Sequence, residues 1–401
     1  MTVVKQAVEN YPFGPAEAVD LHARYAEVRA ERPLTRVTMP HGGDAWLATR
    51  YDDIKVVLAD PRFSRAATVG KDVPRIRLFF EEENILSMDD PEHSRLRKLV
   101  AKAFTMRRVE QMRGRSQEIA EALVDDLIAS EQPADLAEKV AWLLPITVIC
   151  EMLGIPVEDH RKFRGWIDTW LVVGDESEVE AMNEARYEKL PEYMRAIIAK
   201  RREQPTDDLL SALVAARDND DRLSEDELVT MGIALLATGH HTTANQLANY
   251  LYILLTQREY WEQLVEDPSL IPSAVEELLR FTPLSPYSEN TRIAMEDIEL
   301  GGQVLKAGEA VMVFPAVGNR DPEVFERPEE LDLTRKHNPH IAFGHGIHHC
   351  LGAPLARMEL QIALSTLIRR LPTLALAVPA EEVPWKSEHV VRGVGALPVR
   401  W

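Results

Sequence analysis

The sequence lacks any run of apolar residues that approaches the roughly 20 needed to cross a bilayer. Its opening residues, Met1 to Gln6, contain no apolar stretch of the signal-peptide type. Only two cysteines, Cys150 and Cys350, occur in 401 residues, which excludes a disulfide framework. Basic residues are outnumbered, with 46 Lys and Arg against 65 Asp and Glu, for a formal net charge of −19. These absences predict a cytoplasmic protein with no membrane partner and no nucleic-acid partner.

Apolar residues make up 45% of the chain, which is enough for a large core, and the length alone allows two or three domains. Helical spacing dominates residues 51–290 and 350–371, and it also predicts a helix over residues 15–31. Short β-type stretches occur in three parts of the chain, residues 31–50, 291–315 and 373–401. The pattern therefore indicates a mainly α protein with a smaller β-rich region.

The most informative stretch runs from Phe343 to Gly352 and reads Phe-Gly-His-Gly-Ile-His-His-Cys-Leu-Gly. Its three glycines permit backbone conformations that a side chain would forbid, and they let a flat ligand come close. Cys350 stands at the mouth of a predicted helix that has Pro354 in its first turn. Free N–H groups and the positive end of the helix dipole favour a thiolate there. A thiolate held by backbone amides suits an axial ligand of haem iron.

Two other interpretations of this cysteine are open at this point. An isolated intracellular cysteine is often a buried and unreactive small apolar residue. Alternatively, Cys350 with His345, His348 and His349 could bind zinc. Zinc sites usually recruit a second pair of ligands at defined spacing, however, and the sequence contains no Cys-x-x-Cys.

Phe343, Gly346, Cys350 and Gly352 fit the pattern Phe-x-x-Gly-x-x-x-Cys-x-Gly, and the loop thereby resembles that of the cytochrome P450 monooxygenases. The resemblance implies a single domain over residues 1–401 with the P450 fold, mainly α with a smaller β-rich region. It implies haem b as the cofactor and Cys350 as the axial ligand of its iron. The sequence of the loop and of the following helix most resembles that of actinobacterial enzymes that tailor polyketides and macrolides.

The resemblance also assigns further residues to cofactor binding: His93, Arg97, Arg292, His348, Phe343, Gly344 and Gly352. His93 and Arg97 stand four residues apart, so they share one face of a predicted helix that Asp90 could cap. In the family, a His-x-x-x-Arg pair at this place binds the haem propionates. Taken alone, the pair is also compatible with a solvated basic face.

Ser224 and Glu227 form a capping-box pattern, which predicts the start of a long helix that extends to about Thr256. Its apolar centre is followed by Thr-Gly-His-His-Thr-Thr at residues 238–243. Threonine hydroxyls can bond to preceding carbonyls, and Gly239 removes bulk, so we expect a groove to open in the helix here.

Thr242 takes the place of the threonine that the family uses in oxygen activation, and His241 stands where the family usually has an acid. We expect Thr242 and His241 to be catalytic, because an oxygenase must deliver protons and an imidazole can relay them. The alternative is that His241 faces away from the site and binds a partner in the core.

Glu277 and Arg280 match the Glu-x-x-Arg pair that the family buries as a structural ion pair. A buried pair needs its remaining donors and acceptors satisfied. The family often adds a third, basic residue later in the chain, but Glu330 occupies that position here. Arg335 or His340 could replace it, and the sequence does not distinguish between them.

A basic segment interrupts this acidic chain: between Glu92 and Arg115 there are eight Lys and Arg residues and only two acids. The basic members are Arg95, Arg97, Lys98, Lys102, Arg107, Arg108, Arg113 and Arg115. Because complementary charge speeds encounter, we expect this segment to dock a ferredoxin-type electron donor.

The resemblance thus implies a monomeric haem-thiolate monooxygenase that hydroxylates a C–H bond or epoxidises a C=C bond of a medium-to-large secondary metabolite. Two rival functions remain. One is a peroxide-driven or rearranging haem-thiolate enzyme, suggested by His241 in the acid position. The other is a non-catalytic haem-binding or ligand-binding protein.

Overall fold

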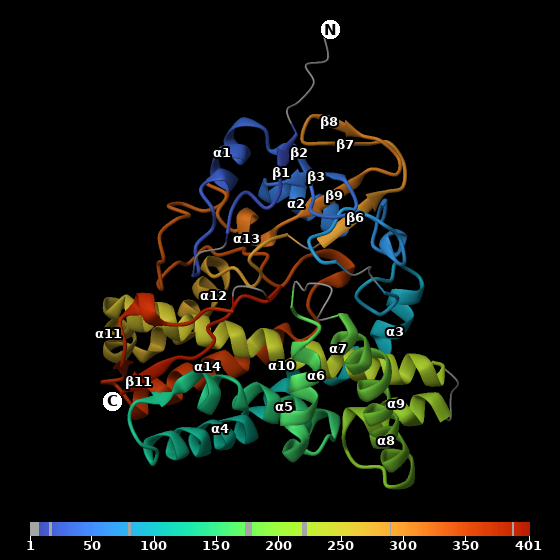
Figure 1. The fold of residues 1–401 in the computed structure, drawn as a ribbon. Coiled ribbons are helices and arrows are strands. Elements are labelled where there is room, and N and C mark those ends of the chain that lie inside the picture. The colour runs from blue at the N-terminus through green and yellow to red at the C-terminus, as the bar shows by residue number, and fades with distance from the viewer. Residues whose placement is uncertain are drawn as a thin grey trace. The chain divides into compact units, whose positions relative to one another are not determined.

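The computed structural model describes residues 8–15, 18–78, 82–172, 179–218, 223–288, 290–386 and 389–401. Its described residues form two compact units (Figure 1). Unit 1 comprises Met1–Arg95, Leu279–Leu331 and Lys336–Cys350, and unit 2 comprises Leu96–Leu278, Asp332–Arg335 and Leu351–Trp401. Helices α3 (Glu92–Ala101) and α12 (Ile271–Phe281) each contribute residues to both units.

Unit 1 is built on a six-stranded mixed sheet with the strand order β1-β2-β3-β9-β6-β4. These strands are β1 (Glu9–Asn10), β2 (Leu34–Thr38), β3 (Asp44–Ala48), β4 (Phe63–Ser64), β6 (Asn290–Ala294) and β9 (Ala310–Val313). A separate hairpin pairs β7 (Ile298–Leu300) with β8 (Gln303–Leu305). In the sheet, β9 runs parallel to β3 and antiparallel to β6, where Arg292 lies opposite Val311.

The helices of unit 1 are short: α1 (Arg24–Glu31), α2 (Tyr51–Ala59), α13 (Pro315–Gly318) and the 3₁₀ turn η7 (Gly346–His348). Helix α2 buries Ile54, Val57 and Leu58, whose spacing places them on one face. They pack in one core with residues of the six-stranded sheet, including Phe63 of β4 and Val311 of β9. The helix predicted over residues 15–31 is correct only in its second half, because α1 begins at Arg24; residues 16–17 of the predicted range lie outside the described residues.

Unit 2 is mainly helical. Its helices include α4 (Met106–Ile128), α5 (Leu143–Leu153), α6 (His160–Asp168), α7 (Val179–Asn183), α8 (Leu190–Glu203), α9 (Leu209–Asp218), α10 (Glu225–Thr256), α11 (Arg258–Glu266) and α14 (Ala353–Arg370). A small antiparallel sheet pairs β11 (Pro398–Arg400) with β10 (Ala375–Leu376) and with β5 (Ala134–Asp135). Within this unit α10 packs on α5, and α14 packs on α4 (Figure 1).

Helix α10 starts where the sequence predicts. The Ser224 N–H donates to the Glu227 carboxylate at 2.6 Å, and the Glu227 N–H donates to the Ser224 hydroxyl at 3.1 Å. This reciprocal pair satisfies two N–H groups that the first turn leaves without partners. The helix then runs without a break to Thr256, and most of its second half is buried.

Most strands lie in the three parts of the chain where the sequence predicts them, but the two-residue strands β1, β4 and β5 lie outside those parts. None of the helices in the described parts of the chain is both long and apolar enough to span a bilayer. The organisation of the two units as one domain stays a prediction.

Candidate functional site

The cysteine loop of unit 1 is a tight turn closed by a hydrogen bond between its ends, in which the Cys350 N–H donates to the Phe343 carbonyl at 2.8 Å. Gly344 and Gly346 have φ angles of 74° and 72°, in the left-handed region that favours glycine. A Cβ on Gly346 would lie 2.4 Å from the Leu58 carbonyl oxygen of α2. The glycines therefore let the loop lie directly against the backbone of α2.

The two cysteines have opposite environments. Cys150 of α5 is fully buried, and burial raises the pKa of its thiol to about 12, so this residue is the unreactive one. Cys350 is exposed at the end of its loop. Among the described residues no group of three or more His, Cys, Asp or Glu side chains is arranged to hold a metal ion. The zinc interpretation of Cys350 thus gains no support from its neighbours.

Unit 1 also brings together several cationic or potentially cationic side chains. His93 of α3 and His348 of η7 lie with their ring centroids 4.3 Å apart, and His93 is only 1% exposed. Arg292 is 4% exposed on β6. Burial, with help from neighbouring Arg65, lowers the pKa of Arg292 to about 10, although Asp89 opposes this shift. Burial first, and then His93 and Arg292, lowers the pKa of His348 to about 3.

This cluster has the donor chemistry of a site for carboxylates. The Nε2 atom of His348 and the Nε atom of Arg292 are buried, and neither has a hydrogen-bond partner among the described residues. Such groups are costly to bury unless a ligand or water satisfies them. The two propionates of haem would supply negative charge and acceptor oxygens to His93, Arg292 and His348. The residues of this cluster therefore fit haem, the cofactor that the cysteine loop predicts.

Two further predicted cofactor residues belong to unit 2. Arg97 lies one helical turn after His93 on α3 and is half-buried, and Asp90 accepts a hydrogen bond from the Ser94 N–H at 3.1 Å near the start of this helix. Gly352 is the residue before α14, which has proline in its first turn. The predicted helix start after the cysteine is therefore present, as is the predicted cap at Asp90.

Thr242 lies on an accessible stripe of α10. Thr238 is exposed and Thr242 is half-buried, whereas most residues from Thr243 to the end of the helix are buried. The Thr242 hydroxyl donates to the Thr238 carbonyl at 3.1 Å, and the Thr238 hydroxyl donates to the Ala234 carbonyl at 2.7 Å. The predicted bonding of these hydroxyls to preceding carbonyls is present.

His241 points away from that stripe into the interior of unit 2. It is 2% exposed, and its Nε2 atom lies 2.8 Å from Oδ1 of Asp168, the last residue of α6. Its ring meets the Trp142 ring edge-on, with the centroids 4.7 Å apart. The structure therefore gives His241 the core partner that one of the two sequence interpretations required.

Gly239 does not open a groove in α10. A Cβ at this position would lie 2.7 Å from two side-chain atoms of Ile149 on α5. The glycine instead makes room for close packing of α5 against α10, and the predicted groove at this residue is wrong.

The structure decides which residue completes the Glu277 network. Glu277 is fully buried, and its Oε2 atom lies 3.0 Å from the Nε atom of Arg335. Its Oε1 atom accepts a hydrogen bond from the Asp332 N–H at 2.9 Å. Arg280, which is 1% exposed, donates to backbone carbonyls of its own unit. Arg335 is therefore a third member of this network.

Three residues with a part in these clusters were not predicted: Arg65, Asp89 and Asp168. Arg65 and Asp89 flank the long segment after β4, and Asp168 follows an apolar stripe on α6. Each is a single charged residue without a motif, so no local signal in the sequence distinguishes it from a surface residue.

Comparison with known proteins shows the family to which the chain belongs. Residues 22–389 match the family model described as cytochrome P450. The chain is 50% identical over 394 residues to nocardicin C N-oxygenase of Nocardia uniformis subsp. tsuyamanensis, covering 98% of both chains. It is 47% identical to mycinamicin IV hydroxylase/epoxidase of Micromonospora griseorubida, again covering 98% of both.

A crystal structure of HinD with NMFT and NO superposes with a TM-score of 0.94 and 47% identity, covering 98% of this chain and 100% of that chain. The chain therefore belongs to the cytochrome P450 family. The predicted family, the fold class and the assignment as a monooxygenase are confirmed, as is a haem-iron cofactor. The non-catalytic alternative does not fit this membership.

Proposed function

We propose that this enzyme uses haem b, with Cys350 as axial ligand, to insert one oxygen atom of O₂ into a C–H or C=C bond of a medium-to-large natural product such as a macrolide or polyketide. It acts as a cytoplasmic monomer with electrons from a ferredoxin and its reductase. The observation that carries the proposal is the exposed Cys350 in a loop that also holds His348. The Nε2 atom of His348 and the Nε atom of Arg292 are buried without a hydrogen-bond partner among the described residues, so both are open to carboxylates. The bound haem supplies the oxygen-activating chemistry, and the protein orients substrate and moves protons.

The names of two relatives support the proposed substrate class. One is named for epoxidation and hydroxylation of mycinamicin IV, and another for N-oxygenation of nocardicin C. A screen of macrolides, polyketides and amine-bearing natural products for ligand-induced shifts of the haem spectrum tests the class. Mass spectrometry of turnover products then separates C-oxygenation from N-oxygenation, the second candidate, since an N-oxide or oxime is lost on mild reduction.

Thr242 is proposed to orient and protonate the oxygen being activated, because its hydroxyl lies on the accessible stripe of α10. Thr242→Ala is expected to release hydrogen peroxide in place of product, with the peroxide yield per reducing equivalent raised about tenfold or more. Thr243→Ala, at the neighbouring buried position, is the matched control and should stay coupled. Equal coupling in Thr242→Ala and the parent enzyme would show that the hydroxyl has no such role.

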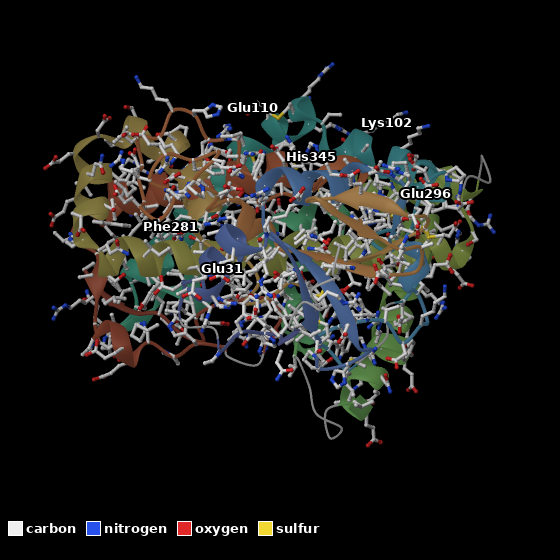
Figure 2. The ribbon with its side chains drawn as sticks, turned by 90° about the horizontal axis from the view of Figure 1, so that it is seen from above. Glu31, Lys102, Glu110, Phe281, Glu296 and His345 are labelled. Carbon is white, nitrogen blue, oxygen red and sulfur yellow. The ribbon has the colours of Figure 1, made fainter. Side chains whose placement is uncertain are left out.

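The docking of the electron donor is assigned to the basic segment that contains Lys98 and Lys102. Both side chains are exposed, and neither forms an ion pair with another described residue; Lys102 is labelled in Figure 2. In contrast, Arg115 forms an ion pair with Glu151, with Nη2 and Oε1 2.8 Å apart. Arg113 forms one with Glu110, with Nε and Oε1 2.8 Å apart. The two lysines border a groove of about 840 Å³ in unit 2. Unpaired positive charge beside an open groove suits an acidic protein partner.

Reversing these charges tests the docking face. The double variant Lys98→Glu, Lys102→Glu is expected to slow reduction by an acidic ferredoxin about tenfold or more at low salt, because steering by charge is lost. The difference should shrink in ~0.5 M salt, which screens exposed charges. A control with Lys71→Glu and Lys200→Glu makes the same change in net charge at exposed lysines elsewhere. Similar slowing by both double variants would assign the effect to net charge alone.

The peroxide-driven alternative is distinguished by comparing turnover with hydrogen peroxide and turnover with O₂ and a reductant. We expect the second to be faster. A higher rate with peroxide, for a substrate that shifts the haem spectrum, would favour the alternative.

A further inference from the structure

A buried imidazole and a carboxylate from another helix form a pair inside unit 2. The Nε2 atom of His241 on α10 lies 2.8 Å from the Oδ1 atom of Asp168, at the end of α6. The side chain of His241 is 3% accessible, whereas that of Asp168 is 34% accessible. Asp168 is therefore the member of the pair that reaches solvent, and His241 is the member that lies in the helix beside Thr242.

The neighbours of His241 fix its ring and its tautomer. The Trp142 ring meets it edge-on at 80°. The side-chain amide of Asn245 donates to the His241 carbonyl at 2.8 Å and lies 3.5 Å from Nδ1. The His241 Nε2 and Asp168 Oδ1 atoms lie 2.8 Å apart, and neither makes an aligned hydrogen bond with a described residue. From this short distance we assign the hydrogen of neutral His241 to Nε2. The basic atom that remains is Nδ1.

The charges around the pair set its resting state. Arg164 and Lys386 lie over the Trp142 ring, at 4.1 and 4.4 Å from its centroid. Burial alone would raise the pKa of Asp168, but His241 and these two cations outweigh it, and the pKa lies below its ordinary value. Burial lowers the pKa of His241 while Asp168 opposes the shift. At neutral pH the pair is thus a carboxylate with a neutral imidazole.

Comparison with the adjacent His240 shows how the Asp168 carboxylate affects the pKa of His241. His240 faces the core, where its Nδ1 atom lies 2.6 Å from the Leu236 carbonyl and its ring meets Phe163 edge-on. Its Nε2 atom is buried without a hydrogen-bond partner among the described residues. Burial, and then the charge of His241, lowers the pKa of His240 to about 3. A histidine in this interior without a carboxylate therefore stays neutral.

We propose that Asp168 is the positioning residue of a histidine–carboxylate pair that supplies protons through His241. The proposal rests on the function proposed for Thr242, and it names the residue on which His241 depends. In each transfer Nδ1 takes one proton from water, which makes an imidazolium compensated by Asp168. Nδ1 then releases that proton to a water or hydroxyl acceptor and becomes neutral again. Asp168 keeps its negative charge, Nε2 keeps its hydrogen, and no electrons move.

In this arrangement the carboxylate that the family usually carries on the helix of Thr242 comes from α6. The exchange also makes proton supply depend on α6, since the pair exists only while Asp168 lies against α10. A histidine at position 241 can therefore take the place of the usual acid, because Asp168 supplies the carboxylate.

The test is Asp168→Asn, which keeps the size of the side chain and removes its charge. The peroxide yield per reducing equivalent should rise about fivefold or more and kcat should fall about 10–100-fold, in the range of lost general acid–base help. KM and the substrate-induced spectral shift should stay within about twofold, because His241 is buried away from the accessible stripe. Since the carboxylate raises the pKa of His241, its removal should lower that pKa, and the acidic limb of the rate profile should move to lower pH.

A second readout does not depend on turnover. Nitrogen-15 NMR of the histidine rings should show His241 of the parent protein as the neutral Nε2–H tautomer, and Asp168→Asn should lower the pKa of this ring. Asp168→Glu should restore most of the coupling. The matched control His240→Gln changes the neighbouring buried ring and should leave the peroxide yield within about twofold of the parent's.

Three results would overturn the inference. They are an Nδ1–H tautomer of His241 in the parent protein, an unchanged peroxide yield and ring pKa in Asp168→Asn, and equal uncoupling in Asp168→Asn and His240→Gln. If Thr242→Ala uncouples while Asp168→Asn does not, the pair is structural and the function proposed for Thr242 stands. If Thr242→Ala is also fully coupled, the proposed proton route itself is wrong.

Discussion

Replacing Cys350 with serine is expected to abolish substrate turnover, because a serine hydroxyl stays protonated at neutral pH and cannot take the place of the thiolate. The loop should still fold, since its closing hydrogen bond uses the backbone N–H of residue 350 and the carbonyl of Phe343. The measurement is product formation with O₂, ferredoxin and reductase, together with the absorption spectrum of the variant.

The matched control is Cys150→Ala. Cys150 is fully buried on α5, so its loss costs some stability by leaving a small cavity but should leave the spectrum and the turnover intact. Turnover by Cys350→Ser at a rate near that of the parent would remove Cys350 from its assigned role. Loss of the haem spectrum in Cys150→Ala, at a temperature where the variant is folded, would indicate that Cys150 and not Cys350 binds the iron.

The second large effect is expected at Glu277. Glu277→Gln removes the charge that faces Arg335, and both side chains are almost inaccessible, at 0% and 7%. An uncompensated buried charge is costly, so the free energy of unfolding should fall by about 3–5 kcal/mol. Denaturant unfolding of the haem-loaded protein, followed by circular dichroism, measures the change.

An exposed ion pair gives the comparison. Arg113→Gln breaks the contact of Arg113 with Glu110 at 2.8 Å, where the side chains are 43% and 61% accessible. Such pairs contribute about 0–1 kcal/mol, so this variant should unfold close to the parent. The double variant Glu277→Gln, Arg335→Met should recover part of the loss, because it removes both charges of the Glu277–Arg335 contact. Equal destabilisation by Glu277→Gln and Arg113→Gln would mean that the network of Glu277 is not a support of the core.

Some features were predictable because their signals are local. The start of α10 depends on Ser224 and Glu227, three residues apart, and both hydrogen bonds of the predicted capping box are present. The turn of the cysteine loop likewise follows from its own glycines. Gly346 adopts a φ angle that other residues avoid, and its Cβ position is filled by the backbone of α2.

Other features depend on residues far apart in the sequence. Arg335 lies 58 residues after Glu277, and His340 is chemically as suitable, so only the fold shows which of them approaches the carboxylate. Gly239 was expected to open space, but it is filled by Ile149 from another helix. The same holds for His241. The sequence shows an unusual base at position 241, whereas its partner Asp168 lies on α6 and carries no motif of its own.

The measurement that tests the central claim most directly is the carbon monoxide difference spectrum of the reduced parent protein, purified from cells well supplied with haem. A thiolate ligand donates more electron density to the iron than an imidazole does, and it shifts the main absorption band strongly to the red. If Cys350 binds the iron, we expect that red-shifted band, with an intensity that matches one haem per chain. A colourless protein, or a band at the position of a histidine-bound haem, would contradict the assignment of Cys350 as the iron ligand.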